Sequence, residues 1–290
     1  MNTLHKNTFF SSQKSINCCG KLLILEKPVI MGILNITPDS FYDGGKYSAI
    51  NNIIEHTKIM IDEGAAIIDI GAVSTKPGAK TVSLSEEKKR LLPVVKLLLK
   101  EIPEIIISID TFRSEIAKAA IEEGACIIND ISAGQFDEKM FTTIAKLQVP
   151  YIIMHIQGTP ENMQVAPHYK NVVQEVLYYF SEKINQLVQL GVNDIIIDPG
   201  FGFGKTVEHN YDLLNHLDFF RTLNLPILAG VSRKSMINKV LGTKPESALN
   251  GTTVLNTMAL MKGANILRVH DVKEAVETVK LFNALKNPIV

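Results

Sequence analysis

The 290-residue sequence lacks an excess of charge of either sign, because 30 lysines and arginines balance 30 aspartates and glutamates. A chain without net charge is not built to coat nucleic acid or an anionic membrane, so any basic site must be local. No apolar run reaches the roughly 18 residues that a membrane-spanning helix needs. Residues 1–21 contain no continuous apolar core followed by a small-residue cleavage site. We therefore expect no nucleic-acid partner, no membrane partner and no export signal.

Cysteine is also scarce: Cys18 and Cys19 are adjacent, and Cys126 lies inside an apolar run. Three cysteines without a C-x-x-C spacing argue against a disulfide framework and against a zinc site. We interpret them as small hydrophobic side chains in or near the core. Free cysteines are typical of a reducing compartment, so the sequence predicts a cytoplasmic location.

The sequence is rich in short runs of isoleucine, valine and leucine that alternate with longer amphipathic stretches. Nearly continuous apolar runs are typical of parallel strands that are buried on both faces. Eight such runs occur, at residues 29–35, 66–71, 104–110, 126–130, 151–156, 194–200, 226–232 and 266–270. They predict an α/β fold of the (β/α)8 TIM-barrel type over residues 29–290, with an open doubly wound sheet as the alternative. Residues 1–28 are predicted to be an N-terminal extension, with a short hairpin that plugs the N-terminal end of the barrel.

Local signals place several helix ends. Ser83 and Glu86 have the spacing of a capping box at the start of a helical pattern over 83–100. Pro93 lies inside this pattern and predicts a kink or a later helix start. Gly124 follows another helical pattern, in a position typical of a helix C-cap.

Polar side chains stand at the ends of all eight runs. In a barrel of this type, functional groups lie at the C-terminal ends of the strands. The side chains there belong to Asn35, Asp69, Asp110, Asn129, His155, Asp198, Ser232, and Arg268 with His270. Taken singly, Asp69 could be a buried structural carboxylate and His155 a core histidine. Eight polar ends on one rim nevertheless predict a shared polar site.

The predicted site has two electrostatic halves. The middle strands supply the carboxylates and amide of Asp110, Asn129 and Asp198, which suit a flat heterocycle edged with N–H donors. Positively charged or imidazole side chains come from the second loop and the last two strands, namely Lys76, Arg233, Lys234, Arg268 and His270. Because the chain has no net charge, this concentration of cations indicates an anion such as phosphate.

The glycine-rich stretch 198–210 looks like a phosphate-binding P-loop. The position five residues before Gly204 is Pro199 instead of glycine, however, so the P-loop spacing fails. The dinucleotide-binding spacing G-x-G-x-x-G fails as well. We interpret the glycines as allowing a tight backbone turn past a planar ligand, with Phe203 and Lys205 presented to that ligand.

Seven motifs in a fixed order resemble those of a known family. They are MGILNITPDSFYDGG (31–45), IDIGAVSTKPGA (68–79), SIDT (108–111), INDISAG (128–134), IIDPGFGFGK (196–205), GVSRKSMI (230–237) and LRVHDV (267–272). Over residues 28–285 the chain resembles the dihydropteroate synthases, folate-pathway enzymes that sulfonamides inhibit. Val73 and Lys76 are departures, since many members have glutamate and arginine there. A lysine lacks the bidentate fork that arginine offers to phosphate.

The resemblance implies a transferase reaction. In that reaction p-aminobenzoate displaces pyrophosphate from 6-hydroxymethyl-7,8-dihydropterin diphosphate and gives 7,8-dihydropteroate. The electron-rich pterin can delocalise positive charge, so a dissociative step is expected. Mg²⁺ is the implied cofactor, and a homodimer is expected from the family. One alternative is a pterin-binding domain of the methyltetrahydrofolate methyltransferase type, which shares the barrel but needs no phosphate-binding cluster. A second alternative is a non-catalytic pterin-binding paralogue with a regulatory or carrier role.

The resemblance also implies roles for individual residues. The pterin would be bound by Asp110, Asn129, Ile131, Met154, Asp198 and Lys234. The diphosphate would be bound by Asn35, Thr75, Lys76, Arg268 and His270, with Asn35 also a ligand of Mg²⁺. The p-aminobenzoate would be bound by Phe41, Pro77, Phe203 and Ser235. Catalysis would depend on Asn35, Lys234, Arg268 and His270.

Overall fold

The structure, a computed structural model, describes residues 15–36, 46–73 and 82–286. Its centre is a sheet of eight parallel strands in the order β8-β7-β6-β5-β4-β3-β10-β9. These strands are β3 (Val29–Asn35), β4 (Ile67–Gly71), β5 (Ile107–Asp110), β6 (Ile127–Asp130), β7 (Tyr151–Met154), β8 (Ile195–Asp198), β9 (Leu228–Ala229) and β10 (Ile266–Val269). A parallel bridge between Ile197 and Ile227 joins the two outer strands. The predicted barrel is therefore confirmed, with one strand in each of the eight runs.

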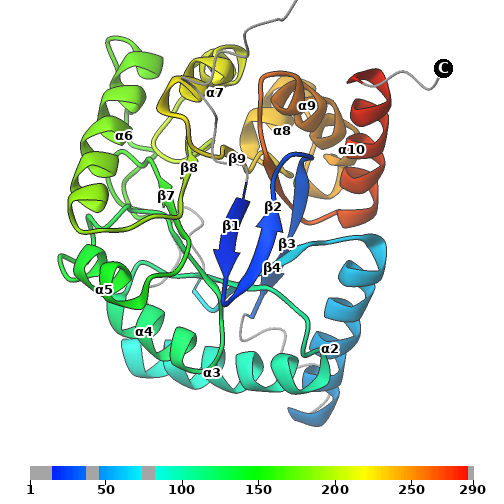
Figure 1. Ribbon diagram of the computed structural model, residues 1–290. Helices are drawn as coiled ribbons and strands as arrows, with labels where there is room; N and C mark the ends of the chain where they lie inside the picture. The colour runs from blue at the N-terminus through cyan, green and yellow to red at the C-terminus, as the bar shows by residue number, and fades with distance from the viewer. Residues whose placement is uncertain (1–14, 37–45, 74–81, 287–290) are drawn as a thin grey trace, which may run out of the picture.

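Helices form a ring around the barrel (Figure 1). They are α2 (Lys46–Glu63), α3 (Leu84–Glu101), α4 (Ser114–Glu122), α5 (Met140–Leu147), α6 (Val172–Gln189), α7 (Val207–Asn215), α8 (Ser235–Leu241), α9 (Leu249–Met261) and α10 (Val272–Lys286). Two short 3₁₀ helices, η2 (Leu217–Leu223) and η3 (Pro245–Ser247), lie between them in the sequence. In the described part of the chain, none of the helices is long and apolar enough to cross a membrane.

The strands are buried on two faces because each lies between the barrel interior and the helices. On β4, Ile68 and Ile70 belong to the large apolar cluster between the sheet and the surrounding helices. Ile67 belongs instead to a second cluster, inside the N-terminal end of the barrel. Asp69 is fully buried and shares the inward direction of Ile67, since side chains alternate along a strand. This alternation decides which strand-end residues face the site.

The N-terminal hairpin closes one end of the barrel. It consists of β1 (Ser15–Cys18) and β2 (Lys21–Ile24), which pair in antiparallel register. Ile16, Cys18 and Leu25 are buried in one cluster with inward residues of the barrel strands. Figure 1 shows the hairpin lying across the middle of the ring of helices. The predicted plug at the N-terminal end is therefore confirmed.

The local helix signals hold in part. Ser83 is the N-cap of α3 and accepts a hydrogen bond from the backbone N–H of Glu86. The Glu86 carboxylate accepts from Nε of Arg90 at 2.8 Å, so only the Ser83 half of the predicted capping box is seen. Helix α3 begins at Leu84 and continues through Pro93, so a later helix start is wrong. Gly124 lies one residue beyond the C-cap of α4 with φ +105°, a left-handed conformation that glycine adopts at little cost.

Candidate active site

A narrow hollow of about 20 Å³ lies at the C-terminal ends of the strands. It is lined by Asp110, Asn129, Ile131, Met154, Asp198, Phe203, Gly230, Lys234 and Arg268. All six residues that the family resemblance implies for a pterin are among them. A cavity needs roughly 10–15 Å³ to hold one water molecule. The present hollow is therefore too small for a bicyclic ring until some side chains move.

Asp69 organises the floor of this hollow from inside the barrel. Its carboxylate is fully buried. It accepts hydrogen bonds from Oγ of Ser108 at 2.6 Å, Nδ2 of Asn129 at 3.0 Å and Nε of Arg268 at 2.6 Å. The amide of Asn129 thus points its nitrogen at Asp69. Asp69 is the buried structural carboxylate that the sequence left as one alternative, and it orients two residues of the hollow.

Arg268 is shared between two carboxylates. In addition to Asp69, it bonds through Nη2 to Oδ2 of Asp110 at 2.8 Å. Burial raises the pKa of Asp110 to about 7, although the Arg268 guanidinium lowers it and the Asp69 charge raises it further. The positively charged half of the site is therefore paired with the acceptor half in this state, instead of standing apart from it.

Lys234 lines the same hollow as Arg268. Its Nζ donates to the carbonyl oxygen of Phe201 and lies 4.7 Å from the centre of the Phe203 ring. Burial lowers the pKa of Lys234 to about 8, against the opposing effect of the Asp198 carboxylate. Burial also raises the pKa of Asp198, and Lys234 opposes that shift. The two groups form an electrostatic pair in a poorly solvated site, as is typical of functional centres.

Gly230 keeps the hollow open and was missed by the sequence analysis. A Cβ atom at this position would lie 3.8 Å from both Oδ2 of Asp198 and Nζ of Lys234. A longer side chain would therefore enter the space between the carboxylate and the ammonium. The available signal was a glycine within a run of strand-forming residues, which often marks a close approach of backbone to a ligand.

His155 does not share the hollow, so the prediction of one site for all eight strand ends is wrong at this position. It follows Met154, which faces inward, so its own side chain turns outward. The ring is buried, accepts a hydrogen bond at Nδ1 from Nζ of Lys205 at 2.9 Å, and packs edge-on against Tyr179. It lines a separate cavity of about 470 Å³ near α6, together with Tyr169 and other side chains. Burial lowers the pKa of His155 well below its usual value, as does the Lys205 ammonium.

Lys205 is not presented to a ligand either. The side chain is only 3% exposed, and its Nζ bonds to backbone carbonyls as well as to His155. Phe203, the other residue predicted to face the ligand from this loop, does line the hollow.

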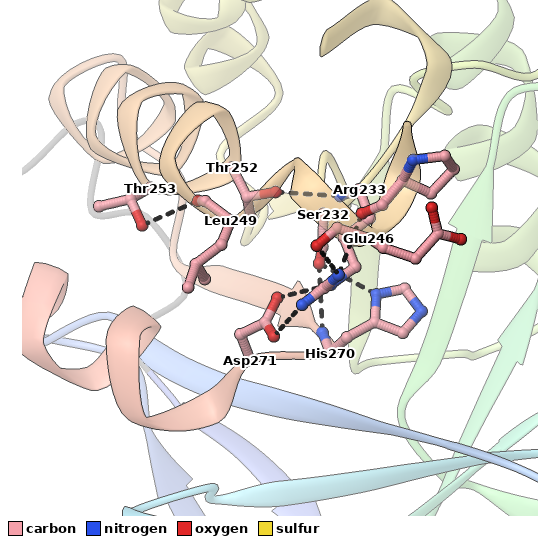
Figure 2. Close-up of polar contacts among 9 residues, drawn as sticks. Ser232, Arg233, Glu246, Leu249, Thr252, Thr253, His270 and Asp271 are labelled. Atoms are coloured by element: carbon pink, nitrogen blue, oxygen red, sulfur yellow. Dashed lines mark hydrogen bonds and ion pairs between the residues drawn. The ribbon is translucent and has the colours of Figure 1, made fainter. Parts of the chain in front are cut away.

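Arg233 is held in a structural network beside the site (Figure 2). Its guanidinium makes two bonds to Asp271, Nε to Oδ2 at 2.9 Å and Nη2 to Oδ1 at 2.6 Å, and further bonds to the carbonyls of Pro245 and Glu246. The expectation that Arg233 contributes to an anion site is therefore wrong in this structure. The neighbouring Ser232 hydroxyl lies 3.0 Å from Nδ1 of His270, which leaves the imidazole exposed at the rim.

The remaining predicted residues lie at the rim or outside the described residues. Asn35 is exposed at the end of β3, and Ser235 is the exposed first residue of α8. Phe41, Thr75, Lys76 and Pro77 fall outside the described residues, so their predicted roles stay predictions.

Known proteins share this arrangement of strands and motifs. Residues 31–270 match the family described as pterin binding enzyme. The dihydropteroate synthase of Escherichia coli is 44% identical over 267 residues, which cover 91% of this chain and 94% of that protein. The crystal structure of the Yersinia pestis dihydropteroate synthase with a sulfonamide drug is 40% identical, with a TM-score of 0.88, and covers 94% of this chain and 99% of that one. The chain belongs to the dihydropteroate synthase family.

Membership of the dihydropteroate synthase family makes the chain a transferase of folate synthesis. It also decides against the methyltransferase alternative, since the synthase of Bacillus subtilis matches as well, with 42% identity over 90% of this chain and 90% of that protein. A further solved relative, from Xanthomonas albilineans, is a dihydropteroate synthase with 4-aminobenzoic acid. It is 38% identical, with a TM-score of 0.88, and covers 95% of this chain and 99% of that one.

Proposed function

We propose that the chain condenses 6-hydroxymethyl-7,8-dihydropterin diphosphate with p-aminobenzoate, giving 7,8-dihydropteroate and pyrophosphate. The observation that carries this proposal is the meeting of two carboxylates and two cations around one hollow, from Asp110, Asp198, Lys234 and Arg268. The carboxylates suit the N–H edge of a pterin, and the cations suit a diphosphate. Methyl transfer from a folate would need the two carboxylates but not the two cations.

The pterin ring would lie among apolar side chains that already cluster at the hollow. Ile131 and Met154 belong to one buried apolar cluster, against which Phe203 packs. Entry of the ring requires Arg268 and Lys234 to leave their present partners. Arg268 would then exchange Asp110 for a diphosphate oxygen, and Asp110 would accept a hydrogen bond from the ring instead.

Mg²⁺ suits the diphosphate end of this site. Mg²⁺ is usually held by one or two protein oxygens together with substrate phosphates and water. Among the described residues, no group of three His, Cys, Asp or Glu side chains could hold a metal. The exposed amide of Asn35, at the mouth of the barrel, would supply one protein oxygen, with the diphosphate supplying others. When bound there, the ion would neutralise charge on the departing pyrophosphate.

The chain's own residues would act mainly through positioning and charge. The bond between the pterin methylene carbon and the diphosphate oxygen would break with both electrons leaving on pyrophosphate. Arg268 and His270 would hold the pyrophosphate as its charge grows, while Asp110 and Asp198 would hold the ring. The amine of p-aminobenzoate would then form the C–N bond to the methylene carbon and release its proton to solvent.

The p-aminobenzoate ring would stack near Phe203, the described member of the predicted slot. The carboxylate of this substrate would meet Ser235, which is exposed at the first position of α8. Phe41 and Pro77 would complete the slot.

Pyrophosphate release provides the test of this function. We expect pyrophosphate release to need the pterin diphosphate and Mg²⁺, and formation of 7,8-dihydropteroate to need p-aminobenzoate as well. Release without the amine would show that bond breaking precedes attack. Excess chelator should slow release by at least about 100-fold, because a metal ion contributes several kcal/mol to stabilising such charge. Asn35→Ala should raise the Mg²⁺ concentration needed for half-maximal rate, whereas Asn52→Ala, at an exposed position of α2, should not. Full activity in excess chelator would remove Asn35 from the mechanism.

We also propose that the chain forms a homodimer through α9 and α10. Exposed apolar side chains form a stripe on α9, with Val254, Met258 and Met261 between 44% and 65% exposed. Leu281 and Leu285 on the adjoining α10 are 74% and 70% exposed. Single exposed apolar residues are ordinary, but several on two helices that pack together favour an interface.

Light scattering after gel filtration tests the dimer. The wild type should have twice the monomer mass of 32.1 kDa. Met258→Glu should shift it to the monomer, because a carboxylate would be buried at the interface. Leu22→Glu, at a more exposed apolar position on the hairpin, should leave the dimer intact. A monomeric wild type would contradict the proposal.

We propose a cytoplasmic location on the state of the cysteines. Cys18, Cys19 and Cys126 are all free thiols, although Cys18 and Cys19 lie close to Cys126 at the hairpin end of the barrel. The absence of a disulfide among these three cysteines fits a reducing compartment.

A further inference from the structure

Lys205 is a buried cation that the proposed reaction does not use. Its Nζ meets four acceptors: Nδ1 of His155 at 2.9 Å and the carbonyl oxygens of Gly200 at 2.9 Å, Phe203 at 3.0 Å and His155 at 3.2 Å. All four of these hydrogen-bond partners are uncharged. Burial lowers the pKa of Lys205 well below its usual value, and the nearby Asp198 carboxylate opposes only part of that shift. Burying an ammonium is costly even beside a carboxylate, so an apolar side chain would serve stability better. We therefore look for the role of Lys205 in the backbone carbonyls that its Nζ binds.

Two of the carbonyls that Lys205 binds, those of Gly200 and Phe203, belong to the loop between β8 and α7. Gly200, Gly202 and Gly204 in this loop all have φ between +62° and +83°, a region that side chains with a Cβ rarely adopt. The loop also packs backbone against backbone: a Cβ atom on Gly200 would lie 2.0 Å from the carbonyl oxygen of His155. Such a glycine-rich turn has little intrinsic stiffness, because glycine retains many backbone conformations.

This loop carries two of the contacts that form the hollow. The ring of Phe203 lines the hollow, and the carbonyl of Phe201 accepts from Lys234. Lys205 holds the backbone one residue before Phe201 and at Phe203 itself. The ammonium thus holds both ends of the four-residue segment 200–203, which presents the ring.

We infer that Lys205 is a positioning residue for the p-aminobenzoate side of the site. It holds the carbonyls of Gly200 and Phe203 and so keeps the Phe203 ring in one orientation. The part of this inference that concerns p-aminobenzoate rests on the proposed function. The part that concerns the ring does not, so the two can fail separately.

Fluorine NMR of the full chain labelled with 4-fluorophenylalanine tests the position of the ring without substrate. The Phe203 resonance is assigned by its loss in Phe203→Leu. It should be single and narrow in the wild type, and broadened or split in Lys205→Met. Lys183→Met, which removes a half-buried lysine from the outside of the barrel, should leave it unchanged. An unchanged resonance in Lys205→Met overturns the inference, whatever the activity.

Steady-state kinetics tests the link to p-aminobenzoate. Lys205→Met should raise KM for p-aminobenzoate about tenfold, the size typical of coupling between neighbouring groups. The dissociation constant of the pterin diphosphate, measured by calorimetry, should change by less than about threefold. In a Phe203→Ala background the same substitution should raise KM by less than about twofold, because its effect passes through the missing ring.

Two kinetic outcomes would contradict the link. Equal effects of Lys205→Met in the two backgrounds would show that Lys205 does not act through Phe203. A disturbed Phe203 resonance with unchanged KM would instead show that Phe203 does not contact p-aminobenzoate. If Lys205→Met fails to fold, Lys205→Gln is measured in its place, since its amide keeps N–H donors for part of the carbonyl set.

Discussion

Replacing Lys234 with methionine is expected to lower kcat/KM for pyrophosphate release by about 100- to 1,000-fold, as removal of one group that stabilises a charged transition state typically does. The ammonium lies against Asp198 and Phe203 at the hollow, where a poorly solvated charge acts strongly. Stability should change far less than activity, because methionine removes the desolvation cost of the buried ammonium together with its attractions. Urea unfolding and a pyrophosphate-release assay measure the two effects.

The pH profile provides a second measure of Lys234. Burial lowers the pKa of Lys234 to about 8, so the ammonium is present below this pH and is lost as the pH rises through it. If the ammonium is the active form, kcat/KM of the wild type should fall above about pH 8, because this ratio reports the free enzyme. In Lys234→Met the decrease of kcat/KM above about pH 8 should be absent. Lys239→Met, at an exposed position of α8, the helix that follows Lys234, should keep both the alkaline decrease and the activity. Wild-type activity in Lys234→Met would remove the residue from the mechanism.

Replacing Arg268 with methionine is expected to destabilise the fold by about 3–5 kcal/mol, the range found when one partner of a buried ion pair is removed. The guanidinium bonds to Asp69 at 2.6 Å and to Asp110 at 2.8 Å, so both carboxylates would remain buried without a cation. Pyrophosphate release should also fall by about 100-fold or more, since the diphosphate would lose a bidentate partner. Arg221→Met, at an exposed position, should leave both properties unchanged.

Acid should partly restore the Arg268→Met protein. The folded-state pKa of Asp110, about 7, lies above the unfolded value of 3.8, so this group favours the fold at low pH and loses that contribution as the pH rises through about 7. Without Arg268 the folded-state pKa of Asp110 rises further. Urea unfolding should therefore show a smaller deficit near pH 5 than near pH 8. A double variant with Asp110→Asn should recover stability but not activity; recovery of both would contradict a role for Arg268 in holding the diphosphate.

The acceptor half of the site could be predicted from the sequence, because the positions of its residues follow from where each strand ends. Asp110, Asn129 and Asp198 each stand at the end of an apolar run, and parallel strands in a barrel end on the same rim. His155 also ends a run, yet it faces the helices, because a shift of one residue along a strand reverses the side-chain direction. The predictions for Lys205 and Arg233 were wrong for another reason. Their charges suggested a ligand, but Lys205 binds backbone carbonyls and Arg233 binds Asp271.

The sequence by itself determined the eight apolar runs, their alternation with helices, and the polar inventory at the strand ends. Those features are local, since they follow from periodicity along a single segment. Only the tertiary structure decided the pairing of charges, such as the bond from Arg268 to Asp69, which are 199 positions apart. That contact exists because closure of the sheet brings β10 next to β3 and hence near β4. The predicted barrel gives the order of the strands, but spacing along the chain does not show which carboxylate a given charged side chain meets inside it.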